Sequence, residues 1–106
     1  MSAVELTRLV EMLARQTSQW TPARWSAVAE PGTPSRAELV YGLIQRIADL
    51  AAEVEGQHRR EIPPMESPLL LIDQLRVMAA DLILAGAPEG LTHAAAADVS
   101  EVRALL

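Results

Sequence analysis

The sequence of 106 residues contains no cysteine, lysine, asparagine or phenylalanine, and all nine of its basic residues are arginines. Without cysteine the chain has no disulfide, no thiolate nucleophile and no cysteine-based zinc site. Without lysine it can form neither a Schiff base nor the lysine-containing loop that binds phosphates in P-loop proteins. The lack of asparagine excludes N-glycosylation. These absences remove several common classes of enzyme and of secreted protein.

Basic patches and long apolar segments are also missing. The formal net charge is −5 and the arginines are scattered among acidic residues, which disfavours binding to nucleic acid. Apolar runs such as residues 69–72 are far too short to span a bilayer. Residues 1–5 lack the basic start and the apolar segment of a signal peptide. We therefore expect a cytoplasmic protein with no nucleic-acid partner and no membrane partner.

Half of the residues are hydrophobic, which is enough for one folded domain over residues 1–106. A Ser or Thr directly before a Pro is typical of a helix start. The hydroxyl accepts a hydrogen bond from a free backbone N–H of the first turn, and Pro itself has no backbone N–H that would need a partner. Three such pairs occur: Thr21-Pro22, Thr33-Pro34 and Ser67-Pro68. Two capping boxes are also predicted, Ser2 with Glu5 and Ser35 with Glu38.

Apolar residues recur with the helical period, and no segment alternates with the period of a strand. We predict an all-α bundle with main helices at about 2–19, 34–56, 68–85 and 92–105, and a short connecting helix at about 22–29. Gly56 should end the helix at 34–56, and Thr92 should cap the last helix. We expect the helices at 34–56 and 68–85 to pack antiparallel. The predicted core includes Leu9, Leu13, Leu43, Ile47, Leu50, Val54, Leu75, Met78 and Leu82.

The helix at 68–85 has apolar residues on two sides. Its main stripe runs through Leu75 and Leu82, and a second stripe of Leu70, Val77 and Leu84 follows at heptad spacing on the opposite side. A helix that is apolar on two faces lies between two neighbours. Either this helix is central in the monomer, or its second face meets another chain.

Two tryptophans flank a proline corner, at Trp20 and Trp25. Tryptophan is common at interface hot spots, but a protein without phenylalanine also uses it to fill the core. Trp20 is in register with the apolar face of the first helix, which favours the core for Trp20. Trp25 is the better interface candidate, together with Leu70, Val77 and Leu84.

Residues that could support catalysis or bind metal are few. Glu55 and His58 form a single Glu-x-x-His, whereas a di-iron bundle needs two such motifs and two further glutamates. We assign no catalytic residue, no metal ligand and no cofactor. The sequence therefore favours a non-enzymatic protein-interaction or regulatory module that self-associates as a homodimer. The alternative is a small-ligand or metal-dependent enzyme with carboxylates inside the bundle, drawn from Asp49, Glu53, Asp73 and Asp81.

Overall fold

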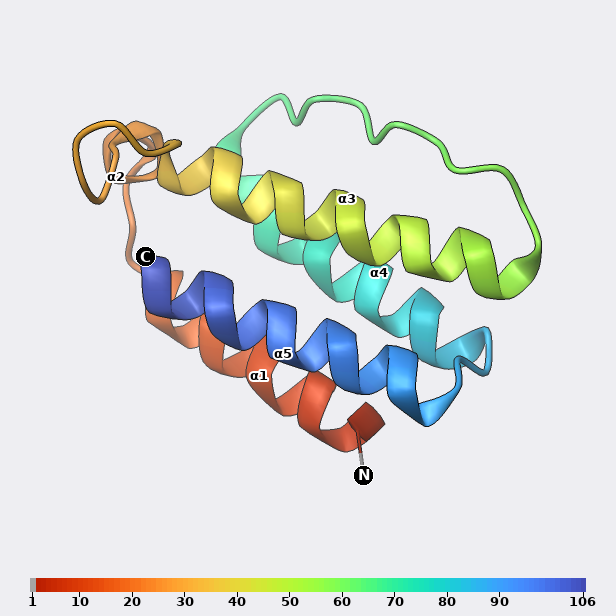
Figure 1. Cartoon of the computed structure of the whole chain (residues 1–106). Helices are drawn as coiled ribbons and strands as arrows, with labels where there is room; N and C mark the ends of the chain where they lie inside the picture. The colour runs from red at the N-terminus through yellow and green to blue at the C-terminus, as the bar shows by residue number, and fades with distance from the viewer. Residues whose placement is uncertain (1) are drawn as a thin grey trace.

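The computed structural model describes residues 2–106 and confirms an all-α bundle (Figure 1). Within these residues four long helices and one short helix pack together with a single 3₁₀ turn. The elements, in chain order, are α1 (Ser2–Thr17), α2 (Pro22–Ser26), α3 (Arg36–Glu55), η1 (Pro68–Leu70), α4 (Leu71–Leu84) and α5 (Glu89–Leu105). No helix in the described part of the chain has both the length and the apolar character needed to cross a membrane.

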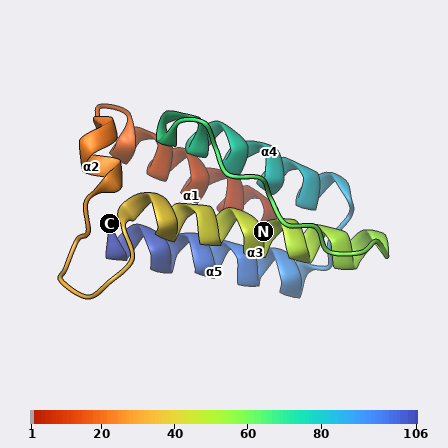
Figure 2. The ribbon, with the colours of Figure 1, turned by 90° about the horizontal axis from the view of Figure 1, so that it is seen from above.

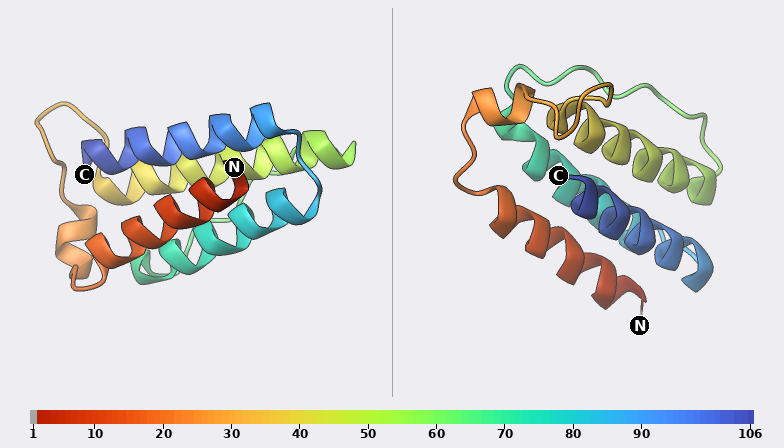
Figure 3. Two further views of the ribbon diagram at one scale, coloured as in Figure 1. Left: turned by 90° about the horizontal axis from the view of Figure 1, so that it is seen from below. Right: turned by 60° about the vertical axis from the view of Figure 1, so that its left-hand side comes forward.

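The four long helices form a ring in the order α1, α5, α3, α4, with each helix packed against its two neighbours. Helices α1 and α5 run in one direction, and α3 and α4 run in the other (Figures 1 and 3). The short α2 closes one end of the bundle, against α3 and η1. Every long helix therefore keeps one side free of other long helices.

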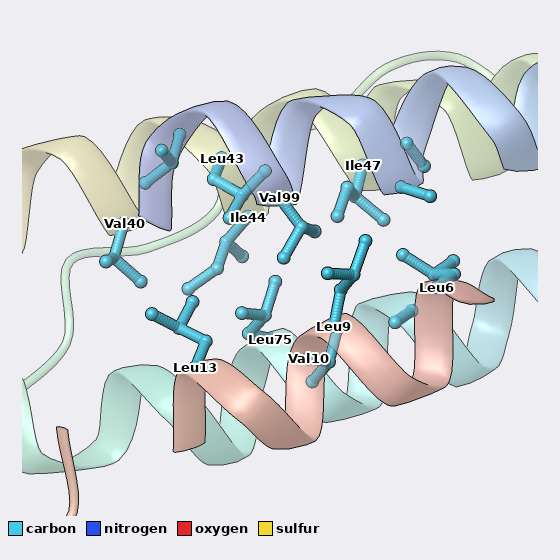
Figure 4. Close-up of a cluster of buried hydrophobic side chains, with 14 of the residues drawn as sticks. Leu6, Leu9, Val10, Leu13, Val40, Leu43, Ile44, Ile47, Leu75 and Val99 are labelled. Atoms are coloured by element: carbon cyan, nitrogen blue, oxygen red, sulfur yellow. The ribbon is translucent and has the colours of Figure 1, made fainter. Parts of the chain in front are cut away.

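The core lies along the axis of this ring, where apolar side chains from the four long helices interdigitate (Figure 4). Six of the nine predicted core residues are buried: Leu9, Leu13, Leu43, Ile47, Leu75 and Leu82. Leu50, Val54 and Met78 are only partly buried and pack against the edge of the core. The last helix contributes fully to the core, since Ala95, Ala96, Val99 and Val102 are buried.

The expected antiparallel packing of the helices at 34–56 and 68–85 is wrong. Residues 56–67 cross back along the outside of α3, so that α4 starts beside the start of α3 and runs parallel to it (Figure 2). Two side chains of α3 hold this crossover. The Tyr41 hydroxyl donates to the Ile62 carbonyl. Gln45 donates to the Arg60 carbonyl over 2.9 Å and accepts from the Ile62 N–H over 2.7 Å.

Local capping explains where several helices start and end. Thr21 accepts from the Arg24 N–H at the start of α2, and Ser67 accepts from the Leu69 N–H at the start of η1. Ser35 and Glu38 form the complete capping box at the start of α3. Gly56 ends α3 in the left-handed region, with φ of 68°, where glycine carries no steric penalty.

Three predicted helix caps are wrong, although α1 does begin at Ser2 as predicted. Thr33-Pro34 lies in the loop before α3, where the Thr33 hydroxyl donates to the Glu30 carbonyl, and α3 begins after Ser35 instead. Ser2 and Glu5 do not form a capping box, because Ser2 N–H donates to the Glu89 carboxylate and Glu5 pairs with Arg8.

The third error concerns the last helix. Thr92 is not its cap, because α5 already begins at Glu89, directly after Pro88. Thr92 is buried in the first turns, where its hydroxyl donates to the Pro88 carbonyl over 3.3 Å. The acidic Glu89 after a proline was the sequence signal for this earlier start, since acidic residues are favourable in the first turn.

Candidate protein-binding face

The second apolar stripe of α4 lies on the surface of the bundle. The exposed fractions are 46% for Leu70, 49% for Val77 and 84% for Leu84. The opposite side of α4 faces the core through four buried residues, Leu71, Leu75, Ala79 and Leu82. The helix is therefore not central in the monomer, and its second apolar side has no neighbour within residues 2–106.

Beside this stripe, α4 packs against α1 and the two helices enclose a seam (Figure 3, left). Two hollows lie along the seam. The first has a volume of about 420 Å³ and the second about 330 Å³. The first is lined by Thr7, Val10, Glu11, Arg76, Ala79, Ala80, Ile83 and Leu84. The second is lined by Ala14, Thr17, Ser18, Trp20, Trp25, Leu69, Ile72, Asp73 and Arg76. We call the seam and the stripe together the α1–α4 face.

Arg76 separates the two hollows, and its charge is neutralised within the chain. Its guanidinium donates to both carboxylate oxygens of Glu11, over 2.8 and 3.0 Å, and to Asp73 over 3.1 Å. Glu11 thus bridges from α1 to α4. The hydrogen bond from Arg76 holds the pKa of Glu11 below its ordinary value.

Trp25 lines the second hollow but contributes almost no exposed surface to the α1–α4 face. Its side chain is only 2% exposed and is part of the core, because α2 folds against α3 and η1 and turns the indole inward. We therefore withdraw Trp25 as an interface candidate. Its ring meets Trp20 edge-on with centroids 4.9 Å apart. Trp20 is partly buried, and the guanidinium of Arg24 lies 4.7 Å from its ring centroid.

The spacing of the two hollows resembles the spacing of the stripe. On α4, one hollow is lined by residues between positions 69 and 76, and the other by residues between 76 and 84. Their centres are thus about eight residues apart, or roughly 12 Å along a helix that rises 1.5 Å per residue. Neighbouring residues of the stripe are seven positions apart, which corresponds to roughly 10 Å.

The acidic residues that the enzyme alternative required do not meet inside the bundle. Asp49 accepts from Gln45, Glu53 lies 3.8 Å from Arg59, and Asp73 is paired with Arg76. Among residues 2–106 the buried polar side chains are Ser2, Thr17 and Thr92, and none is a carboxylate. In the same part of the chain no three His, Asp or Glu residues gather closely enough to hold a metal ion.

The α1 side of the face was missed by the sequence reasoning. Thr7 and Glu11 lie on the polar side of α1 by their spacing, and Ser18 directly follows this helix. Nothing local indicates that α4 is the neighbouring helix. Arg76 is the single basic residue of α4, but Asp73 on the same helix already offers it an acidic partner, so the sequence does not indicate the pairing with Glu11.

Comparisons of the chain with models of protein families, with curated proteins and with solved structures found no match.

Proposed function

We propose that this protein is an interaction module that self-associates through the α1–α4 face. In the proposed two-fold dimer, the α4 stripe of each copy lies in the seam of its partner. The observation that carries the proposal is the match between the seven-residue repeat of the exposed stripe and the separation of the two seam hollows. Two-fold symmetry makes such a surface self-complementary, because each copy offers both the ridge and the groove.

The chemistry of the face supports a protein partner. The first hollow is lined almost entirely by apolar atoms, and Leu84 on its edge is the most exposed large hydrophobic residue of the stripe. Exposed apolar surface rimmed by polar residues is typical of protein-binding sites. Since Arg76 is already paired with Glu11 and Asp73, covering the face would not bury an unpaired guanidinium.

The size of the molecule limits how this dimer can be built. The bundle measures 37 × 27 × 23 Å, so one long face covers between about 850 and about 1,000 Å², and a stable dimer buries about 800 Å² on each partner. The stripe of three residues alone is too small to supply this area. The proposed interface therefore uses the outer surface of α1 as well as α4.

Sedimentation equilibrium over a range of protein concentrations tests the proposal. We expect a reversible shift from the monomer mass to twice that mass. Because each copy carries a net charge of −5, added salt should strengthen association by screening the repulsion between copies. A monomer mass at millimolar protein concentration, in both low and high salt, would refute self-association.

A further inference from the structure

A separate hollow of about 520 Å³ lies on the other side of the molecule, between α3 and the crossover at 56–67. Its α3 side carries Glu38, Tyr41 and Gly42, and its crossover side carries Glu61, Pro64 and Met65. Small-molecule sites commonly have volumes of roughly 300–1,000 Å³ and mainly apolar walls with a few polar groups. This hollow fits that description in both size and lining.

Gly42 is unexpected at this position in the middle of a long helix, because glycine is one of the least favourable residues for a helix interior. Packing within the chain does not require it. A Cβ atom at residue 42 would meet only the tip of the flexible Arg46 side chain, at 3.2 Å. Since Gly42 lines the hollow, any larger side chain here would occupy part of its volume. A glycine at this position is explained if a ligand occupies the part of the hollow beside it.

The crossover wall of the hollow is held in place before any ligand binds. The hydrogen bonds from Tyr41 to the Ile62 carbonyl and between Gln45 and the backbone of Arg60 and Ile62 fix this segment against α3. Ile62 and Met65 also pack against the core. A wall that is already ordered lowers the entropic cost of binding.

The charges around the hollow are negative. Glu38 and Glu61 form no ion pair within residues 2–106, although one oxygen of Glu38 accepts from the Ser35 N–H of the capping box. The guanidinium nearest to Gly42 belongs to Arg46, which is neutralised by two hydrogen bonds to Asp98, of 2.7 and 2.9 Å. An aromatic ring beside two carboxylates that form no ion pair is suited to a cation.

We propose that this hollow binds a small organic cation, an ammonium group carried on an aromatic or aliphatic body. The apolar part lies over Gly42 between Tyr41, Pro64 and Met65, and the ammonium group faces Glu38 and Glu61. This site shares no residue with the α1–α4 face, so binding there is independent of self-association.

Calorimetric titration with three probes of nearly equal size tests the charge requirement: 2-phenylethylamine, 2-phenylethanol and phenylacetate. For so few non-hydrogen atoms we expect the amine to bind with a Kd in about the millimolar range. The alcohol should bind about threefold to fivefold more weakly, and the anion should not bind. Equal binding of amine and alcohol, or no binding of the amine at about 10 mM, overturns the proposal.

Two variants test the location. Gly42→Leu should abolish binding of the amine by filling the hollow, whereas Gly90→Leu is the matched control, because Gly90 is also helical and has open space around it. Glu38→Gln with Glu61→Gln should remove the preference for amine over alcohol, and glutamine still permits the capping box at position 38. If Gly42→Leu binds the amine as tightly as Gly90→Leu does, the hollow is not the site.

Discussion

Arg76 of α4 holds Glu11 of α1 through two parallel hydrogen bonds of 2.8 and 3.0 Å, across the centre of the α1–α4 face. Arg46 holds Asp98 in the same way between α3 and α5. Both bridges are partly exposed to solvent, so each contributes little to the free energy of unfolding. Their geometry matters more, since two-point pairing defines how neighbouring helices are aligned along their axes.

The stability of the protein should depend on pH through Glu11. Its pKa in the folded state lies below the ordinary value of 4.5 because of the hydrogen bond from Arg76. The stabilisation is therefore complete above about pH 4.5 and is lost as the pH falls through the folded-state pKa. After allowing for solvent screening, Glu11→Gln should lower the free energy of unfolding by about 0.5 kcal/mol at pH 7.

Urea denaturation of both proteins at a series of pH values measures this effect. Glu5 and Glu89 also have lowered pKa values, from contacts with Arg8 and Ser2 respectively. They therefore contribute to the loss of stability at acidic pH in both proteins. The informative quantity is thus the difference in the free energy of unfolding between the wild type and Glu11→Gln. That difference should shrink towards zero as the pH falls through the folded-state pKa of Glu11. A difference that stays constant with pH would show that Glu11 acts through packing instead.

The dimer interface should be sensitive to charge at Val77 but not at Val28. The two valines are similarly exposed, at 49% and 46%, but Val28 lies in the loop after α2, away from the α1–α4 face. Val77→Lys should raise the dimer Kd at least about tenfold, because the interface would have to desolvate an ammonium group in place of an apolar contact. Val28→Lys should leave the Kd unchanged.

Denaturation of the same two variants separates the interface from the fold. Surface substitutions usually change the free energy of unfolding by less than about 0.5 kcal/mol. At concentrations where the protein is monomeric, both variants should therefore be as stable as the wild type. Equal dimer affinities for Val77→Lys and Val28→Lys would place the interface elsewhere on the molecule.

Replacing Trp25 should cost far more stability than replacing Trp20. Trp25 is buried, so truncation to alanine removes a large side chain from the core and should cost about 3–5 kcal/mol. Trp20 is only partly buried and keeps one side towards Arg24, so its truncation should cost clearly less. Urea denaturation followed by circular dichroism measures both. Similar losses for the two variants would mean that Trp25 is not the main anchor of this end of the bundle.

Ser35 and Thr33 form a matched pair for the start of α3. Ser35→Ala removes the hydroxyl that accepts from the Glu38 N–H and should cost about 1 kcal/mol. Thr33→Ala removes an exposed hydroxyl whose one hydrogen bond goes to the Glu30 carbonyl in the same loop, and should cost less than about 0.5 kcal/mol. The same denaturation experiment compares the two variants. A larger loss of stability for Thr33→Ala than for Ser35→Ala would indicate that Thr33, and not Ser35, caps α3.

The sequence alone determined the number of helices, most of their ends and the composition of much of the core. These features are local, because helix hydrogen bonds and caps join residues only a few positions apart and the apolar period marks the buried side. Thr21, Ser35 and Gly56 each act within one turn of their own position. The exposed stripe on α4 could be predicted as well, because its heptad spacing is also a local pattern.

The direction of the helices and the pairing of their surfaces depend on contacts between residues far apart in the sequence. The twelve residues of the crossover can extend roughly 40 Å, more than the roughly 30 Å length of α3, so the chain permits either direction for α4. The parallel direction is held by contacts distant in sequence, such as Tyr41 with Ile62. Likewise Trp25 is buried by the folding back of α2, and the seam partner of α4 is set by packing around the whole ring.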